Sequence, residues 1–363
     1  MRQLNEQSIE DIALGAALLG TGGGGDPYIG KLMALQAIKK YGPIDIISID
    51  EVPDDALIVP SAMMGAPTVL IEKIPNGSEF KRAFEVIEKF LSKGKIFATV
   101  PIEAGGVNSM VPLLVAAQMR IPIVDCDGMG RAFPELQMVT YHLEGITATP
   151  MVITDEKGNV GLLDTISNNW AENIARAMTV SMGGAVMINI YHMTGKQLKK
   201  SSIRDIMTYS ERIGRTIREI SQIEGSSIKK LLEVCNGYEL FRGKIVDVLR
   251  ETKRGFNFGT AKIDGIENCK GEKLEINFQN ENLIAKKGNK ILATVPDLIC
   301  NVDLESMLPI TTEALKYGRR IITIGIPCDT KWRTSKGIET VGPRYFGYDI
   351  DYIPVEERVK GVE

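Results

Sequence analysis

The stretch Asp-Cys-Asp-Gly-Met-Gly-Arg-Ala-Phe-Pro-Glu-Leu-Gln-Met at residues 125–138 decides how the rest of the sequence is interpreted. It follows the apolar run Ile121–Val124, which is short and β-branched enough to form a buried strand. In open α/β sheets, ligands bind beyond the carboxyl ends of the strands. Two carboxylates, two glycines and an arginine therefore lie where a site is expected. An isolated motif of this kind is more often a polar turn, but two glycine-rich loops upstream favour a site.

The first of these loops is Gly-Thr-Gly-Gly-Gly-Gly-Asp-Pro at residues 20–27, between predicted helices at 7–19 and 28–40. A glycine-rich turn that leads into a helix can bind an anion or a carbonyl group. The loop is not a Rossmann fingerprint, because a helix precedes it, and no Lys-Ser/Thr pair follows it as in a Walker A loop. The alternative is a flexible connection between two helices.

The second glycine-rich loop and a loop of small residues both follow predicted strands. One is a small-residue loop at 61–67 that contains Gly65, and the other is Pro101–Ser109, which carries Glu103 and Asn108. The alternation of strand, loop and helix predicts an α/β fold with a doubly wound, mostly parallel sheet. The simpler explanations are a surface carboxylate near a helix start for Glu103 and a helix N-cap for Asn108.

Composition excludes several classes of function. The formal net charge of -3 leaves no basic surface for nucleic acid or an anionic membrane. No apolar run reaches membrane-spanning length and the N-terminus has no apolar signal core, so we expect a cytoplasmic protein. The five cysteines are scattered without a C-x-x-C pair, and there are only two histidines. These counts argue against disulfides and a zinc site, and favour carboxylates for acid–base chemistry.

A length of 363 residues predicts more than one domain. We expect an α/β domain at 1–238 and a smaller, swivelling-like β-rich domain at 239–305, where short β-rich runs are broken by Gly and Asn. The segment 306–363 should pack back on the α/β domain. Its stretches Cys328–Thr334 and Val341–Asp349, which are rich in Arg, aromatic and Gly residues, could be an oligomer contact, a lid or surface turns.

The chain resembles a bacterial and archaeal family associated with S-methyl-thiohydantoin desulfurases and found near hydantoinase genes. The resemblance is carried by residues 20–27, Pro101–Ser109, Asp127–Met138, Pro296–Ile299 and Gly342–Asp349. It implies an α/β domain interrupted or followed by a smaller β-rich domain. The implied activity is hydrolysis of an S-methylated thiohydantoin to a hydantoin with loss of methanethiol.

Such a reaction needs a base to activate water, an acid or hydrogen bond on the ring nitrogen, and donors for the ring carbonyl. We assign Asp127 as the base and Asp125 as the group that orients or tunes it. Arg131 would hold an anionic or carbonyl part of the substrate, while Glu103 and Asn108 fix the ring. The remaining residues expected to contact substrate are Thr21, Gly22, Gly23, Gly24, Gly25, Asp26, Gly65, Gly105, Gly106, Gly128, Met129, Gly130 and Glu135.

Other chemistry and one other function remain open. No cofactor is required by the sequence, but a divalent metal held by Asp125, Asp127, Glu103 or Glu135 could activate the water. Cys126 could act as a nucleophile, with His142 as the available activator. The competing function is a nucleotide- or metabolite-binding accessory protein of a hydantoinase-type system, although Lys31 is the basic residue nearest to the glycine run. The expected partners are a small-molecule substrate and further copies of the chain.

Overall fold

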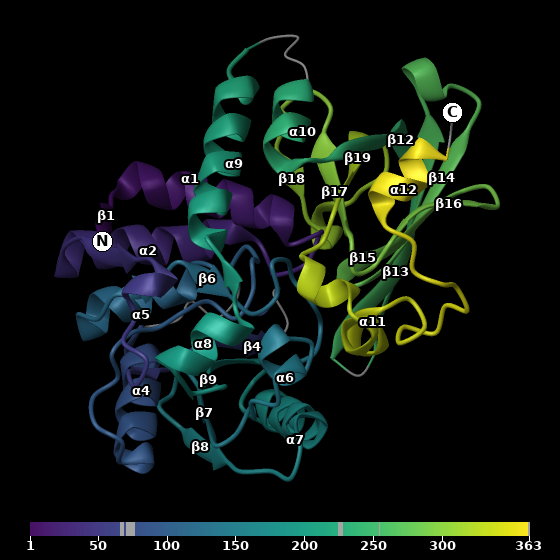
Figure 1. Cartoon of the computed structure of the whole chain (residues 1–363). Helices are drawn as coiled ribbons and strands as arrows, with labels where there is room; N and C mark the ends of the chain where they lie inside the picture. The colour runs from purple at the N-terminus through teal and green to yellow at the C-terminus, as the bar shows by residue number, and fades with distance from the viewer. Residues whose placement is uncertain (66–68, 70–76, 224–227, 254, 362–363) are drawn as a thin grey trace.

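The fold is mixed α/β, with an α/β part formed by residues 1–235 and a large antiparallel sheet formed by the rest (Figure 1). The structure, a computed structural model, describes residues 1–65, 69, 77–223, 228–253 and 255–361. Within these residues, no helix is both long and apolar enough to cross a membrane. In Figure 1 the α/β part is purple to teal and the large sheet is green to yellow.

Parallel pairing in the α/β part is present but short. Strand β2 pairs in parallel with β5 and antiparallel with β1. Single parallel bridges then join Thr99 to Ile123, and Ile58 to Ala98. The α/β class is thus confirmed, but the predicted doubly wound parallel sheet with a swivelling domain is not. The short strands of this region are β1 (Arg2–Leu4), β2 (Ile44–Ile47), β3 (Leu57–Ile58), β5 (Ile123–Val124), β6 (Cys126–Asp127), β10 (Met193–Thr194) and β11 (Ile203–Arg204).

Four described strands form a second, antiparallel sheet in the order β4-β9-β7-β8. Residues 61–65 were predicted as part of a loop, but they form β4 and pair with β9 along their whole length. Ala62 and Met64 of β4 are buried, which satisfies the alternation of a strand with one face in the core. Residues 66 and 67 of the predicted loop lie outside the described residues. The strands are β4 (Ser61–Gly65), β7 (Met151–Thr154), β8 (Val160–Leu163) and β9 (Ala185–Asn189).

Helices cover these sheets, and the closest helix pair depends on glycine. A Cβ on Gly15 of α1 would lie 1.9 Å from the Ser210 carbonyl oxygen of α9, and a Cβ on Gly214 would lie 1.7 Å from that of Asp11. The two helices therefore pack backbone to backbone. The helices of this part are α1 (Glu6–Leu19), α2 (Pro27–Tyr41), α4 (Ser78–Leu91), α5 (Val111–Met119), α6 (Thr140–Leu143), α7 (Asn168–Ser181), α8 (Gly195–Ser201), α9 (Ile206–Ser221) and α10 (Lys229–Cys235), with the 3-10 turn η1 (Ile49–Glu51).

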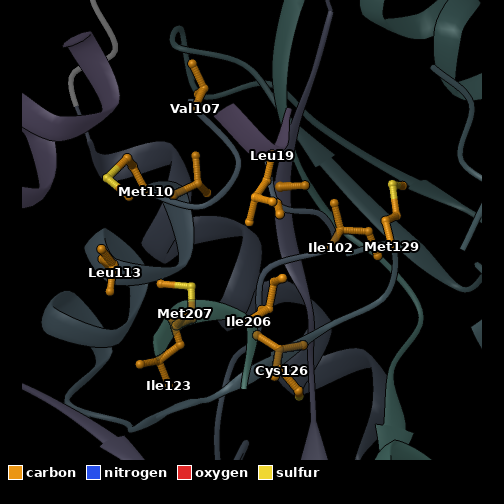
Figure 2. Packing of buried hydrophobic residues seen from close by; sticks show 14 of the residues in the cluster. Leu19, Ile102, Val107, Met110, Leu113, Ile123, Cys126, Met129, Ile206 and Met207 are labelled. Atoms are coloured by element: carbon orange, nitrogen blue, oxygen red, sulfur yellow. The ribbon is translucent and has the colours of Figure 1, made fainter. Parts of the chain in front are cut away.

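The main apolar core lies where the end of α1, the loop before α5 and the start of α9 meet. Figure 2 shows Leu19, Met110, Ile123 and Ile206 converging there, with Cys126 beside Ile206. All five side chains are at most 4% exposed. This core fixes the positions of the loops that follow α1 and precede α5.

Eight described strands form the large sheet, in the order β16-β15-β14-β13-β12-β19-β17-β18. The sheet extends beyond the predicted 239–305 segment, because β19 hydrogen-bonds between β12 and β17. We call it the eight-stranded sheet. Its strands are β12 (Tyr238–Lys253), β13 (Phe256–Gly265), β14 (Lys273–Gln279), β15 (Glu281–Lys287), β16 (Lys290–Thr294), β17 (Leu298–Asp303), β18 (Pro309–Ile310) and β19 (Arg320–Ile326), with the 3-10 turns η2 (Glu267–Cys269) and η3 (Thr312–Ala314).

The chain after β19 contacts both parts of the molecule. It contains η4 (Thr330–Arg333), α11 (Ser335–Val341) and α12 (Val355–Lys360), drawn in yellow in Figure 1. The buried Trp332 donates its indole N–H to the Met129 carbonyl of the α/β part at 2.8 Å. Val355 of α12 belongs to the apolar core of the eight-stranded sheet. The terminal segment therefore helps to hold the two parts together.

Candidate active site

A pocket of about 110 Å³ lies between the α/β part and the eight-stranded sheet. It contains several of the predicted residues, from loops far apart in the sequence. The predicted residues that line it are Gly23, Gly24, Gly25, Gly65, Glu103, Asn108, Met129 and Glu135. The residues that sequence reasoning missed are Ala62, Met63, Met64, Ile102, Val107, Phe133, Pro134, Leu136, Arg176, Ala185, Ile188, Asn280, Glu281 and Glu313.

The glycines of two loops are needed because the loops interlock. A Cβ on Gly24, whose φ is +71°, would lie 2.6 Å from the Gly105 Cα. A Cβ on Gly106 would lie 2.1 Å from the carbonyl oxygen of Gly25. The Val107 N–H donates to the Gly24 carbonyl at 2.8 Å. Backbone rather than side chains thus forms this wall of the pocket, which leaves room for a ligand.

Glu103 is a buried carboxyl with a defined hydrogen-bond environment. One oxygen, Oε1, accepts from Asn108 Nδ2 at 2.7 Å, and the other accepts from the Phe133 N–H at 3.4 Å. Burial raises the pKa of Glu103 to about 7, although both hydrogen bonds and the charge of Arg131 oppose the shift. A carboxyl with this pKa is divided between acid and base near neutral pH, as acid–base catalysis requires.

Asn108 positions Glu103 rather than capping a helix. Its Oδ1 accepts from the Met63 N–H at 2.7 Å while its Nδ2 donates to Glu103. Helix α5 begins after Met110, so Asn108 is not its N-cap. Asn108 therefore joins strand β4 to the loop that carries Glu103.

Two carboxyls from the other side of the pocket were not predicted. Glu281, at the start of β15, is 2% exposed, and its Oε2 has no hydrogen-bond partner among the described residues. Burial raises the pKa of Glu281 well above the ordinary value for Glu. Glu313 of η3 has a raised pKa for the same reason, and its Oε2 also lacks a partner within the described chain. No sequence signal separates Glu281 from other polar residues at β-hairpins, since it is one carboxylate between two asparagines.

Asp125 and Asp127 do not line the pocket, which corrects their predicted placement. Asp125 accepts from the Met207 and Thr208 N–H groups at 2.8 and 3.1 Å, so it satisfies the free donors at the start of α9. Both oxygens of the fully buried Asp127 accept from the Gly130 N–H at 2.9 Å. Asp127 therefore closes a polar turn, the simpler of the two explanations of the motif.

Arg131 also differs from its predicted role. Its guanidinium donates to the Pro296 and Asp297 carbonyls at 2.8 and 2.9 Å, and to Thr21 Oγ1 at 3.0 Å. The side chain is fully buried, and burial lowers its pKa to about 10. Because its donors are used within the protein, Arg131 joins the α/β part to the eight-stranded sheet instead of facing a ligand.

The remaining predicted contacts are structural neighbours of the pocket rather than its lining. Asp26 is the N-cap of α2 and accepts from the Tyr28 N–H at 2.8 Å. The Gly22 carbonyl accepts from the Thr312 N–H at 2.7 Å, and the Gly128 N–H donates to the Ile102 carbonyl at 3.1 Å. The predicted residues outside the lining are Thr21, Gly22, Asp26, Gly105, Gly106, Gly128 and Gly130, besides Asp125, Asp127 and Arg131.

The two alternative chemistries find little support in the arrangement. Cys126 is buried in the apolar core of Figure 2, and burial raises the pKa of its thiol, so the reactive thiolate is disfavoured. In the described part of the chain, no three or more His, Cys, Asp or Glu side chains are gathered so that they could hold a metal ion. Of the carboxylates proposed as ligands, Glu103 and Glu135 line the pocket, whereas Asp125 binds the start of α9 and Asp127 binds the turn that follows it.

The rim of the pocket joins three segments through polar contacts. Glu135 accepts from the hydroxyl of Tyr345 at 2.7 Å, so the terminal segment reaches the pocket. Arg176 of α7 donates to the Pro134 carbonyl at 3.1 Å and forms an ion pair with Glu172. Its guanidinium lies 4.2 Å from the centre of the Phe256 ring on β13. The positive charge of Arg176 at the rim is therefore already paired with Glu172.

Comparison with known proteins gives matches along nearly the whole chain. The sequence models for the S-Me-THD-like N-terminal and C-terminal domains match residues 7–165 and 166–355. No curated protein matches. The fold is similar to the X-ray crystal structure of a protein from Chromobacterium violaceum, with a TM-score of 0.84 and 22% identity, covering 98% of this chain and 100% of that chain.

Proposed function

The chain belongs to the S-Me-THD-like family, and from this premise we propose that it hydrolyses an S-methylated thiohydantoin or a similar ring, with loss of methanethiol. The observation that carries the proposal is Glu103, a buried carboxyl with a pKa of about 7 in a pocket between the two parts. The family description supports a thiohydantoin-related substrate, and the pocket offers Glu103 as a base for the reaction.

The carbon to be attacked lies between nitrogen and sulfur and reacts with an activated water. Ionised Glu103 takes a proton from this water, while Asn108 and the Phe133 N–H hold the carboxylate in position. The side chains of Met63, Phe133 and Ile188 offer apolar surface for the ring and its S-methyl group. Backbone groups of residues 23–25 form the wall against which a flat ring can lie.

The competing nucleotide-binding function lacks support from the charges around the pocket. Glu103, Glu281 and Glu313 are carboxyls, and Arg176 is paired with Glu172. A phosphate would meet these acids without a free cation among the described residues of the lining. An uncharged ring fits the pocket better than a nucleotide does.

The direct test is release of methanethiol from an S-methyl-thiohydantoin by the purified protein and by Glu103→Gln. Glu103→Gln keeps the shape of the side chain but cannot accept the proton, so kcat should fall by roughly 10²–10⁴-fold. In the parent protein kcat should rise as the pH rises through about 7, because deprotonation creates the base. The variant should lose this rise.

The matched control is Glu144→Gln, which changes a carboxyl outside the pocket lining, paired with Lys200 at the surface. It should leave kcat unchanged. Turnover by Glu103→Gln equal to that of the control would eliminate Glu103 as the base. A parent protein that releases no methanethiol from a series of ring-substituted substrates would refute the proposed activity itself.

A further inference from the structure

We infer that Glu281 is the acid of this reaction and gives its proton to the ring nitrogen while Glu103 activates the water. The inference rests on the proposed function and deepens it. It assigns the base to the α/β part and the acid to the eight-stranded sheet, so both parts contribute a reacting group.

The first observation is a carboxyl oxygen that the fold leaves unsatisfied. Glu281 lines the pocket and is 2% exposed, yet its Oε2 accepts and donates no hydrogen bond within the described chain. A buried polar atom without a partner destabilises the folded state. Asp127, buried to the same degree, has both oxygens bonded to backbone. Because Glu281 lines the pocket, a ligand bound there can supply the missing partner.

The second observation is the position of Glu281 relative to Glu103. A Cβ on Gly23 would lie 2.0 Å from Glu281 Oε1, and a Cβ on Gly105 would lie 2.9 Å from Glu103 Oε1. Gly24, next to Gly23, contacts Gly105 directly. Glu281 therefore lies beside Gly23, and Glu103 lies beside Gly105, which contacts the next residue of the same glycine run. A small ring against residues 23–25 can reach both carboxyls.

The surroundings of the two carboxyls separate their protonation states. Glu103 has the Asn108 and Phe133 donors, which favour its ionised form. Burial and the negative charges of Glu103 and Glu313 disfavour the ionised form of Glu281, whereas the positive charge of Arg131 favours it. Burial therefore raises the pKa of Glu281 well above its ordinary value. A carboxyl pair whose environments differ in this way divides into an acid and a base.

The proton transfers balance over one turnover. In the addition step, Glu103 takes a proton from water as the C–O bond forms, and the C=N electron pair takes the proton of Glu281. In the second step, the new hydroxyl returns its proton to Glu281 as the C=O bond forms and the C–S bond breaks. Glu103 then protonates the methanethiolate. The products are a hydantoin and methanethiol, and both carboxyls regain their starting states.

The test uses Glu281→Gln in the full chain with S-methyl-2-thiohydantoin as the probe. Glutamine has the same shape but no transferable proton, so kcat should fall by roughly 10²–10⁴-fold. The parent should also lose activity at alkaline pH, where Glu281 deprotonates. Glu281→Gln should lose this alkaline decline but keep the rise through about pH 7 that belongs to Glu103.

Two further variants make the result decisive. Glu275→Gln lies on the neighbouring strand β14, outside the pocket lining, and should match the parent. Glu281→Asp keeps the acid and should recover part of kcat together with the alkaline decline. A slow Glu281→Gln that retains the decline, or one as fast as Glu275→Gln, would overturn the inference while the proposed function stands. A parent protein without methanethiol release would overturn both.

Discussion

At the scale of single residues, the hydrogen bonds of a buried carboxyl indicate its role. Asp125 accepts from two backbone N–H groups and the Thr208 hydroxyl, and Asp127 accepts from the Gly130 N–H, so both hold the chain in place. Glu103 and Glu281 instead line the pocket, and Glu281 has an oxygen without a partner in the described chain. Residue type alone could not separate these two pairs, because the difference lies in what folding places around each carboxyl.

Arg131 provides a test of a structural role at this scale. Arg131→Met removes the donors of the Pro296 and Asp297 carbonyls and of Thr21 Oγ1. Each buried acceptor left unpaired costs about 1–3 kcal/mol. We expect the free energy of unfolding, measured by denaturant titration, to fall by several kcal/mol.

The control for this variant is Arg82→Met, a change on an exposed position of α4 that should cost little. Near-parent stability of Arg131→Met, combined with a strongly raised KM, would instead support the substrate-holding role assigned from the sequence.

At the scale of elements, the sequence predicts which segments reach the pocket better than where their side chains lie. The loops at residues 20–27 and 101–109 reach the pocket. The predicted loop at 61–67 begins with strand β4, whose pairing partner β9 lies more than a hundred residues away in sequence. Asp127 belongs to the two-residue strand β6 and the turn after it, so its side chain returns to its own backbone. Glu281 could not be predicted, because only long-range packing brings β15 to residues 20–27.

The element-scale prediction concerns the start of α9. Asp125→Ala removes the acceptor of the Met207 and Thr208 N–H groups. Loss of a helix cap costs about 0.5–2 kcal/mol, so thermal and denaturant unfolding should both show lower stability. In the folded variant, kcat for methanethiol release should equal that of the parent, because Asp125 lies outside the pocket lining.

Asp54→Ala, which removes an exposed partner of Lys199, is the control and should leave both stability and turnover nearly unchanged. A large loss of kcat in Asp125→Ala without loss of stability would return Asp125 to the catalytic role.

At the scale of the whole molecule, the pocket depends on contacts between the α/β part and the eight-stranded sheet. The boundaries of these parts differ from those of the predicted segments. The predicted segment 306–363 includes β19, which lies inside the eight-stranded sheet between β12 and β17. Asp297 accepts from the Cys328 and Val355 N–H groups at 2.9 and 2.7 Å, so α12 and its preceding chain are fixed to the same sheet.

Limited proteolysis tests this arrangement. We expect no stable fragment that ends near Asp303, because such a fragment would lack β19. Strands β12 and β17 would then have lost the strand that pairs with both of them. Mass spectrometry of the digest should show either the intact chain, trimmed at exposed sites, or small peptides. A long-lived fragment ending near Asp303, with the remainder released, would show that the terminal segment is not part of the sheet.

The hydrogen bonds between Gly22 and Thr312 have a consequence for synthesis of the chain. Thr312 lies 290 residues after Gly22, yet its hydroxyl and N–H both donate to the Gly22 carbonyl. At about 5–20 residues per second, a ribosome needs roughly 15–60 s to make the intervening chain. Thr312 is missing beside the nascent glycine run for all of that interval, and Glu281 for most of it. A ribosome-bound chain that stalls before these residues emerge should therefore be inactive, however well its first half has folded.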